Sequence, residues 1–215
     1  MITTLLFVLV FSVAIDRGAG IEGIKYLTFL IPGLLMMSVL QNAFANVSSA
    51  FMTAKVTGSI VDLLLAPLGS VEIFIAHNFA GITRGIFVFI ASFILLLVMD
   101  IGYFPINFFW SFLFLILGSF ALSSIGMMAG IWAQKFDQLS IVTNFIIHPL
   151  AFLSGTFYSI ERLPDYLKPI AYSNPFFYII DGFRYGFLGQ SDVSPYISLV
   201  ILLVFNIIIG YGAWY

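Results

Sequence analysis

The sequence predicts an all-α, polytopic membrane protein, and three observations lead to that class. Of the 215 residues, 61% are hydrophobic and only 8% are charged, whereas charged residues make up about a quarter of an ordinary soluble domain. The mean hydropathy is +1.11. The apolar runs are continuous over roughly 15 to 25 residues, which suits spanning helices and not the alternating strands of a membrane β-barrel.

Six apolar runs are candidates for transmembrane helices, because a helix needs about 20 residues to cross a bilayer. The runs are residues 2–15, 26–50, 73–99, 105–133, 139–160 and 195–215. The first is shorter than a full span, so we expect the chain to be truncated at its N-terminus. The runs together predict a single transmembrane domain over residues 1–215.

The second run carries polar side chains at helical spacing. Ser38, Asn42, Asn46, Ser49 and Thr53 recur every three or four residues, which places them on one face of a helix. We call this set the polar stripe. Two interpretations are open at this point: the stripe makes hydrogen bonds to neighbouring helices, or it lines a water-accessible pathway or a dimer interface.

The connection between the second and third runs contains a second polar feature. Residues 59–66 suit a short amphipathic helix, with Ser59 as N-cap and Pro67 directly after its end. Six to eight residues cannot span a bilayer. Such a helix either docks against another protein or lies on the lipid interface.

Two ionisable side chains lie inside apolar runs. Arg84 comes in the first half of the third run, and we expect it to lie near the membrane interface, where its charge reaches water. His148 directly precedes Pro149. We expect this histidine to satisfy backbone carbonyls freed by the proline, with a proton relay as the alternative.

Small residues in the fourth run predict close helix packing. Gly126 and Gly130 have the GxxxG spacing, which lets two helix backbones approach closely. We expect this pair to serve packing within one subunit.

Residues 153–189 separate two apolar runs, yet contain three prolines and six charged side chains. A broken backbone cannot face lipid, because its amide groups would lack hydrogen-bond partners. The segment is therefore expected to cap the membrane or to enter a cavity lined by protein. Asp181 and Arg184 lie three residues apart, a spacing that lets them pair on one helix face.

Motifs for covalent chemistry are missing. The chain has no cysteine, which excludes thiol catalysis and disulfides. His77 and His148 have no second ligand at metal-binding spacing, and His148 and Ser154 fall on different helix faces. No phosphate-binding loop of the G-x-x-x-x-G-K-[ST] type occurs. Energy from a nucleotide must come from a partner, and the net charge of -2 gives no indication of nucleic-acid binding.

Several stretches together resemble one family, the membrane subunits of ABC-2 type transporters. They are LSGTFY at residues 153–158, Leu163 with Pro164, PFFY at residues 175–178, Arg184, the second apolar run over residues 31–51, and GFRYGFLG at residues 182–189. These subunits are bacterial exporter permeases for drugs, polysaccharides or lipid-linked substrates. The resemblance covers essentially the whole chain.

The resemblance implies a six-helix half-transporter that forms a homodimer in the bacterial inner membrane and pairs with two copies of a cytoplasmic ATPase. ATP and Mg would be bound by that partner, and this chain would hold no cofactor. A cytoplasmic coupling helix would contact the ATPase through Ser59, Asp62, Leu63, Leu64, Leu65 and Pro67. Between the fifth and sixth helices, Pro164 and Pro175 would open two short re-entrant helices at the outer face. Their gate residues would be Pro164, Pro175, Tyr178, Asp181 and Arg184.

The function implied is export of an amphipathic drug, a lipid or a lipid-linked glycan by alternating access, with the polar stripe lining the pathway or the dimer interface. The chain would contact membrane lipid and would not itself be an enzyme. Two rival hypotheses stay open. A proton-coupled secondary transporter would use His148, Arg84 or Asp100 as a relay. An intramembrane enzyme would need Ser154 and His148 to act together.

Overall fold

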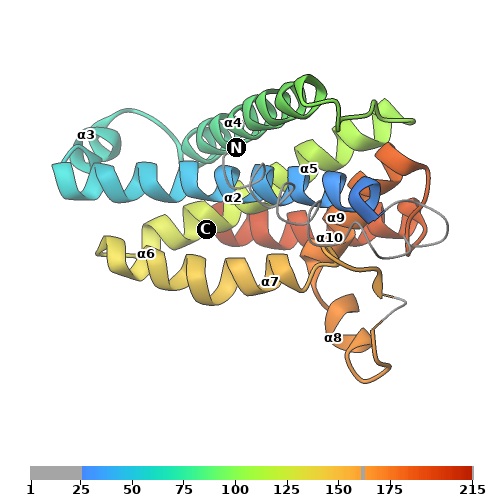
Figure 1. The fold of residues 1–215 in the computed structure, drawn as a ribbon. Helices are drawn as coiled ribbons and strands as arrows, with labels where there is room; N and C mark the ends of the chain where they lie inside the picture. Colours follow the sequence, from blue (N-terminus) through green and yellow to red (C-terminus); the bar gives the residue numbers. More distant parts are fainter. Residues whose placement is uncertain (1–25, 161–162, 215) are drawn as a thin grey trace.

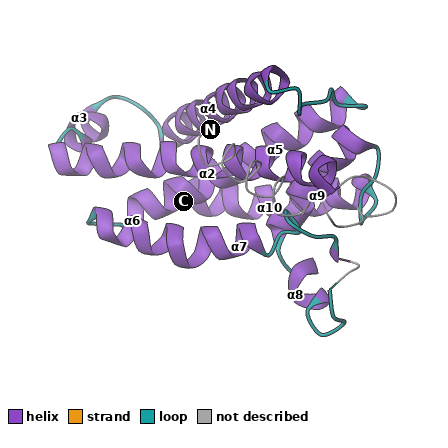
Figure 2. Cartoon of the chain, in the orientation of Figure 1, coloured by secondary structure: helices purple, strands orange, loops and turns teal. Residues whose placement is uncertain are grey.

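The computed structural model describes residues 26–160 and 163–214 (Figure 1). Within these ranges every regular element is helical, so the all-α prediction is confirmed for the described part of the chain (Figure 2). The elements are α2 (Tyr26–Thr57), α3 (Ile60–Leu65), α4 (Ser70–Val98), α5 (Phe108–Trp132), α6 (Phe136–Val142), the π-helix η2 (Thr143–Ile147), α7 (His148–Phe152), α8 (Lys168–Tyr172), α9 (Pro175–Leu188) and α10 (Pro195–Trp214).

Four of these helices, α2, α4, α5 and α10, are long and apolar enough to cross a membrane. They coincide with four of the six predicted runs, although α2 continues to Thr57, past the predicted end at residue 50. The predicted run over residues 2–15 lies outside the described residues. The chain is thus an integral membrane protein with several apolar helices, and the count of six spans stays a prediction.

The fifth predicted run differs from the expected single helix over residues 139–160. The structure has α6, η2 and α7 in direct succession, and the last helical residue is Phe152. The π-turn immediately precedes Pro149, and the His148 N–H donates to the carbonyl of Thr143, five residues earlier. The wide turn accommodates a proline that has no N–H of its own to continue the helix ladder.

Helix α2 is the centre of the bundle. Residues 29–40 are all buried, and α2 packs against α4, α5 and α9. A Cβ on Gly126 of α5 would lie 2.7 Å from the carbonyl oxygen of Phe44, and one on Gly130 would lie 2.9 Å from Cβ of Phe51. The GxxxG pair therefore brings α5 against α2 within the subunit, as predicted.

The bundle has two distinct ends, which lie at opposite sides of Figure 1. At the end marked by α3, Trp214 Nε1 donates to Ser70 Oγ at 3.0 Å. At the end marked by α8 and α9, the Asn107 N–H donates to the Gly186 carbonyl at 2.8 Å. We call them the α3 end and the α9 end. Each carries one of the two polar segments found in the sequence.

Candidate functional site

Helix α9 is set at the α9 end by local signals in the sequence. Pro175 occupies its first turn, as predicted, and the Asn174 side chain accepts the N–H of Phe176 at 3.0 Å. Gly189, with φ of 70°, ends the helix in the left-handed conformation that glycine adopts most readily. The prediction that Pro164 opens the other short helix is wrong. Pro164 precedes a turn, and α8 begins at Lys168 with Pro169 in its first turn.

Glycines seat α9 deeply against α5. A Cβ on Gly182 would lie 2.2 Å from the Phe114 ring, and one on Gly186 would lie 2.2 Å from Ser111 Oγ. Gly182 and Gly186 are four residues apart, so they form a second GxxxG pair, which sequence reasoning missed. The tight contact explains why most of α9 is buried even though it is not among the spanning candidates.

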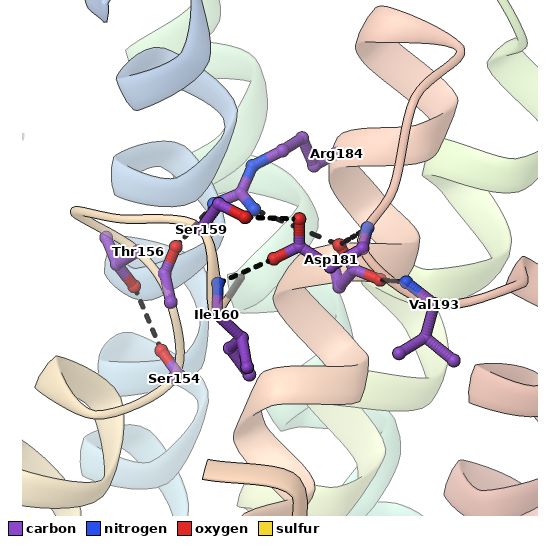
Figure 3. Close-up of polar contacts among 9 residues, drawn as sticks. Ser154, Thr156, Ser159, Ile160, Asp181, Arg184 and Val193 are labelled. Atoms are coloured by element: carbon purple, nitrogen blue, oxygen red, sulfur yellow. Dashed lines mark hydrogen bonds and ion pairs between the residues drawn. The ribbon is translucent and has the colours of Figure 1, made fainter. Parts of the chain in front are cut away.

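The predicted pair of Asp181 and Arg184 exists and is buried. Arg184 Nη1 lies 3.9 Å from Asp181 Oδ1, and the two residues are 2% and 0% exposed. The carboxylate also accepts two backbone N–H groups, from Asp192 at 2.9 Å and from Val193 at 3.0 Å (Figure 3). A buried charge needs such partners, because it has lost its hydration.

Asp192 continues the polar network into the loop before α8. Its side chain accepts the Ser159 hydroxyl at 2.7 Å and the Ile160 N–H at 2.9 Å. Asp181 holds the backbone of Asp192, and Asp192 in turn holds residues 159–160, so α9 fixes both loops that flank it. We call the set Ser159, Asp181, Arg184 and Asp192 the α9 network.

Arg184 links the α9 network to α2. Its Nη2 donates to the Gly155 carbonyl at 2.6 Å, and its guanidinium carbon lies 3.8 Å from the centroid of the Phe29 ring. Gly155 has φ of 71°, and the loop around it lies so close to α2 that a Cβ on Gly33 would be 2.9 Å from the Thr156 carbonyl. One arginine therefore joins three segments that are distant in the sequence.

Other residues of the loop are held internally. The fully buried Ser154 donates to the Ala151 carbonyl, and its oxygen lies 3.0 Å from Thr156 Oγ1 (Figure 3). A hydroxyl that is buried and engaged in this way closes a turn after α7. Nothing in this arrangement activates Ser154 as the nucleophile that the rival enzyme hypothesis requires.

One predicted gate residue remains, Tyr178, which lies buried near the start of α9. Tyr178 is 8% exposed, and its hydroxyl donates to the Tyr172 carbonyl at 2.8 Å. At the start of α8, Lys168 donates to Asp165 of the preceding turn at 2.8 Å, and this hydrogen bond lowers the pKa of the Asp165 carboxyl. This pair has the spacing of Asp181 and Arg184, but the Asp165 side chain is 96% exposed.

The second candidate site is α3, which has no buried residue. Leu63 and Ile60 face the bundle and pack near Val47 and Phe51. The opposite face is open and apolar, with Val61 at 52%, Leu64 at 74% and Leu65 at 79% exposed, and Leu68 in the following loop is 50% exposed.

Two of the predicted α3 residues, Ser59 and Leu63, differ from expectation. Ser59 precedes the helix but makes no capping hydrogen bond, because its hydroxyl lies 3.0 Å from Thr57 Oγ1. Leu63 serves as an anchor to the bundle and not as part of the open face. Pro67 follows the helix end at Leu65, and Asp62 is exposed beside the open apolar face.

The side chains of the polar stripe become more exposed along α2 towards its C-terminal end. Ser38 is buried, Asn42 and Asn46 are half-buried, and Ser49 and Thr53 are exposed. Two members bond to their own helix, with Asn42 Nδ2 donating to the Ser38 carbonyl at 2.9 Å and Ser49 to the Asn46 carbonyl at 3.3 Å. Asn46 instead accepts from Arg84 Nη1 of α4 at 3.3 Å. The stripe opens towards the α3 end.

Neither histidine belongs to the α9 network, but His77 lies beside the residues that anchor α3. His77 stacks on Phe51 at a centroid distance of 4.4 Å and contacts the Ile73 carbonyl through Nδ1 at 2.8 Å. His148 is half-buried at the start of α7. In residues 26–160 and 163–214, no group of three or more His, Asp or Glu side chains gathers as a metal site would require.

Sequence reasoning found Asp181 and Arg184 but missed Asp192, Phe29 and Gly155 as their partners. Asp192 follows the Gly189 helix stop in a short polar turn, which is the only local signal it gives. The contact of Phe29 with Arg184 joins positions 155 residues apart, and no spacing rule reaches that far.

Comparison with known proteins gives consistent matches. Residues 1–188 match the model of the family described as ABC-2 type transporter. The inner membrane transport permease YadH of Escherichia coli K12 is 38% identical over 220 residues, which covers 100% of this chain and 84% of that protein. Nodulation protein J of Rhizobium leguminosarum bv. viciae is 22% identical over 190 residues, covering 87% of this chain and 73% of that protein.

Proposed function

The chain belongs to the ABC-2 type transporter family, and from this premise we propose that it is the membrane-spanning permease of an ATP-driven exporter. The family consists of transport permeases that normally work with an ABC ATPase. We place two copies of a separate ATPase on a permease homodimer in the bacterial inner membrane. The YadH relative is an inner membrane transport permease, which supports that location.

The observation that carries this proposal is the open apolar face of α3. Leu64 and Leu65 are 74% and 79% exposed on a helix that Leu63 anchors to the bundle. An apolar face at the end of a bundle, beside the exposed Asp62, suits a protein partner better than water. We assign α3 as the cytoplasmic coupling helix, with Ser59, Asp62, Leu64, Leu65 and Pro67 in or beside the contact.

The rest of the topology follows from that assignment. The α3 end is cytoplasmic and the α9 end is external, so α8 and α9 are the re-entrant segments. Residues 2–15 and 136–152 supply the two further spans of a single six-helix domain over residues 1–215. The α9 network, with Tyr178 at its rim, is the outer gate.

The mechanism is alternating access powered from outside the chain. Closure of the ATPase pair on ATP pushes α3, and α2 carries the movement to Arg184 through Phe29. The polar stripe lines the pathway or the interface between permease copies. The permease performs no covalent chemistry and binds no cofactor, since ATP and Mg belong to the partner. An amphipathic drug, a lipid or a lipid-linked glycan fits an apolar pathway with a polar stripe.

The test is co-purification with an ATPase encoded beside this chain, followed by measurement of its stimulated ATPase activity. Leu64→Asp places a charge in the apolar contact and Asp62→Ala removes a charge beside it, so both are expected to weaken association and stimulation. Tyr166→Asp is the matched control, because Tyr166 is 75% exposed in the loop before α8 at the opposite end. If all three variants co-purified equally with the ATPase, α3 would not be part of the interface.

A second measurement separates this function from a proton-coupled transporter. Transport by an ATP-driven permease continues when the proton gradient is collapsed and stops when ATP is removed. Transport that follows the gradient and ignores ATP would instead favour the rival, with His148 or Arg84 as the relay.

A further inference from the structure

Arg84 lies beside the middle of α5, at the surface of the bundle and roughly half-way along its length. The next residue, Gly85, packs against Ser119 of α5, whose Oγ would be 2.6 Å from a Cβ at that position. Ser119 comes eleven residues after the start of α5 at Phe108, which is about 16 Å along the helix axis. The hydrocarbon core is about 30 Å thick. If α5 starts at its outer boundary, Arg84 is near the midplane and not near the interface.

A guanidinium at that depth has few partners within the described residues. Arg84 is exposed on the bundle surface and gives one hydrogen bond, from Nη1 to Asn46 Oδ1 at 3.3 Å. It takes part in neither of the ion pairs formed in the described part of the chain. An arginine has five donors, and an ionisable side chain inside the membrane is costly and typical of a binding site or transport pathway.

Polar side chains connect Arg84 with the α3 end. From Asn46 the stripe continues through the exposed Ser49 and Thr53 towards the end of α2 at Thr57. On α4, His77 lies two turns from Arg84 in the same direction. A polar headgroup that enters at the α3 end would therefore meet side chains with which it can hydrogen-bond along its way to Arg84.

A large apolar side chain adjoins the same arginine. Phe87 of α4 is 68% exposed and comes three residues after Arg84, a spacing that makes the two side chains neighbours on the helix surface. An acyl chain can lie on such aromatic surfaces while its headgroup stays with the polar stripe. This surface therefore combines the Arg84 guanidinium, the Asn46 amide and adjacent apolar area.

We propose that Arg84 and Asn46 form a binding site for the anionic headgroup, a phosphate or a carboxylate, of an amphipathic transport substrate. The planar guanidinium pairs with such oxyanions through two parallel hydrogen bonds. Because Asn46 Oδ1 accepts from Arg84, the Asn46 amide nitrogen is a further donor to the same anion. This inference rests on the proposed transport function and narrows its substrate class.

The test is direct binding to the purified permease in a neutral maltoside detergent, without the ATPase. Dodecyl phosphate is the probe, and inorganic phosphate and dodecyltrimethylammonium are the comparison ligands. Dodecyl phosphate is expected to bind saturably. Arg84→Gln is expected to weaken that binding by roughly tenfold or more, Arg84→Lys to retain part of it, and Lys135→Gln, which removes a charge from an exposed loop at the α3 end, to leave it unchanged.

Asn46→Asp gives a second variant that does not remove the arginine. The new carboxylate would pair with Arg84 and occupy its donors, so dodecyl phosphate binding is expected to be lost while the protein stays folded, as judged by gel filtration. Unchanged binding in Arg84→Gln and Asn46→Asp would overturn the proposal, as would absence of binding to the unaltered permease.

The comparison ligands decide what the site recognises. Inorganic phosphate binding as tightly as dodecyl phosphate would show a free-anion site and overturn the amphipathic substrate class. Equal binding of the cationic detergent would overturn the role of charge. Because none of these measurements involves the ATPase, they fail or succeed separately from the co-purification test of the transport complex.

Discussion

The guanidinium carbon of Arg184 lies 3.8 Å from the centroid of the Phe29 ring, so a buried charge of α9 stacks on the first turn of α2. Such contacts are worth about 2 kcal/mol when desolvated. The same helix ends at Thr57, three residues before α3 begins at Ile60 and about 42 Å from Phe29 by helix rise. Both candidate sites are thus connected to one rigid element.

Removing Arg184 is expected to be severe. In Arg184→Leu the carboxylate of Asp181, which is 0% exposed, loses its cation, and breaking a buried pair costs roughly 3–5 kcal/mol. The expected result is a lower free energy of unfolding in detergent–SDS mixtures, together with loss of transport. Lys168→Leu breaks a pair of the same spacing in which Asp165 is 96% exposed. Similar losses in both variants would contradict the structural importance of burial here.

Gly155 is expected to resist substitution because of its backbone. Its φ of 71° is left-handed, a conformation that costs roughly 1–2 kcal/mol for a residue with a Cβ. Gly155→Ala should therefore lower the unfolding midpoint and weaken the carbonyl contact with Arg184. Gly69→Ala is the control, since Gly69 has φ of -74° and open space around it. The argument from backbone conformation fails if the two alanine variants unfold alike.

The seat of α9 on α5 can be tested with one methyl group. Gly182→Ala would push Cβ to 2.2 Å from the Phe114 ring, and overpacking of this kind costs roughly 1–3 kcal/mol. We expect a lower unfolding midpoint and faster proteolysis of the loops beside α9. In Gly210→Ala of α10 the nearest atom is 3.6 Å away, an ordinary contact. An unchanged unfolding midpoint in Gly182→Ala would mean that α9 packs less closely against α5 than the structure shows.

Features of the fold with a local physical cause were predicted well. Continuous apolar runs gave four helices that qualify as spans, and the spacing of Gly126 and Gly130 gave the close contact of α5 with α2. The three-residue separation of Asp181 and Arg184 gave their ion pair. In each case the cause lies within one turn or one run of the chain, so neighbouring residues are sufficient to reveal it.

Features that depend on tertiary context were missed. Pro164 has the sequence signature of a helix start, but the chain makes a turn there, and the helix begins at Lys168 with Pro169 in its first turn. The position of Arg84 beside the middle of α5 follows from the packing of Gly85 on Ser119 and could not be predicted from its own run, while its expected place near the interface stays a prediction. Asp192 was overlooked because its partners, Ser159 and Ile160, lie more than thirty residues away.

Lys55 provides the last prediction, because it fixes the α3 end of the structure. Its ammonium donates to the carbonyl oxygens of Gly130 at 2.9 Å and Ala133 at 2.8 Å, and also to that of Ile131. The last carbonyls of a helix have no intrahelical donors, and a cation there is favourable to the helix dipole. Lys55 therefore holds the end of α5 to α2 one turn before α3.

Lys55→Met is expected to lower the free energy of unfolding by roughly 1–2 kcal/mol, allowing for the partial exposure of the lysine. Hydrogen exchange should increase at the end of α5, and Lys55→Arg should restore part of the protection because it keeps the charge. Lys135→Met is the control, since Lys135 is exposed two residues beyond Ala133. If a partner ATPase moves α3, loss of the Lys55 contact with the end of α5 should reduce the stimulated ATPase activity more than it reduces co-purification with the ATPase. Equal reductions of the ATPase activity and of co-purification would mean that Lys55 supports the contact with the ATPase and not the transmission of movement along α2.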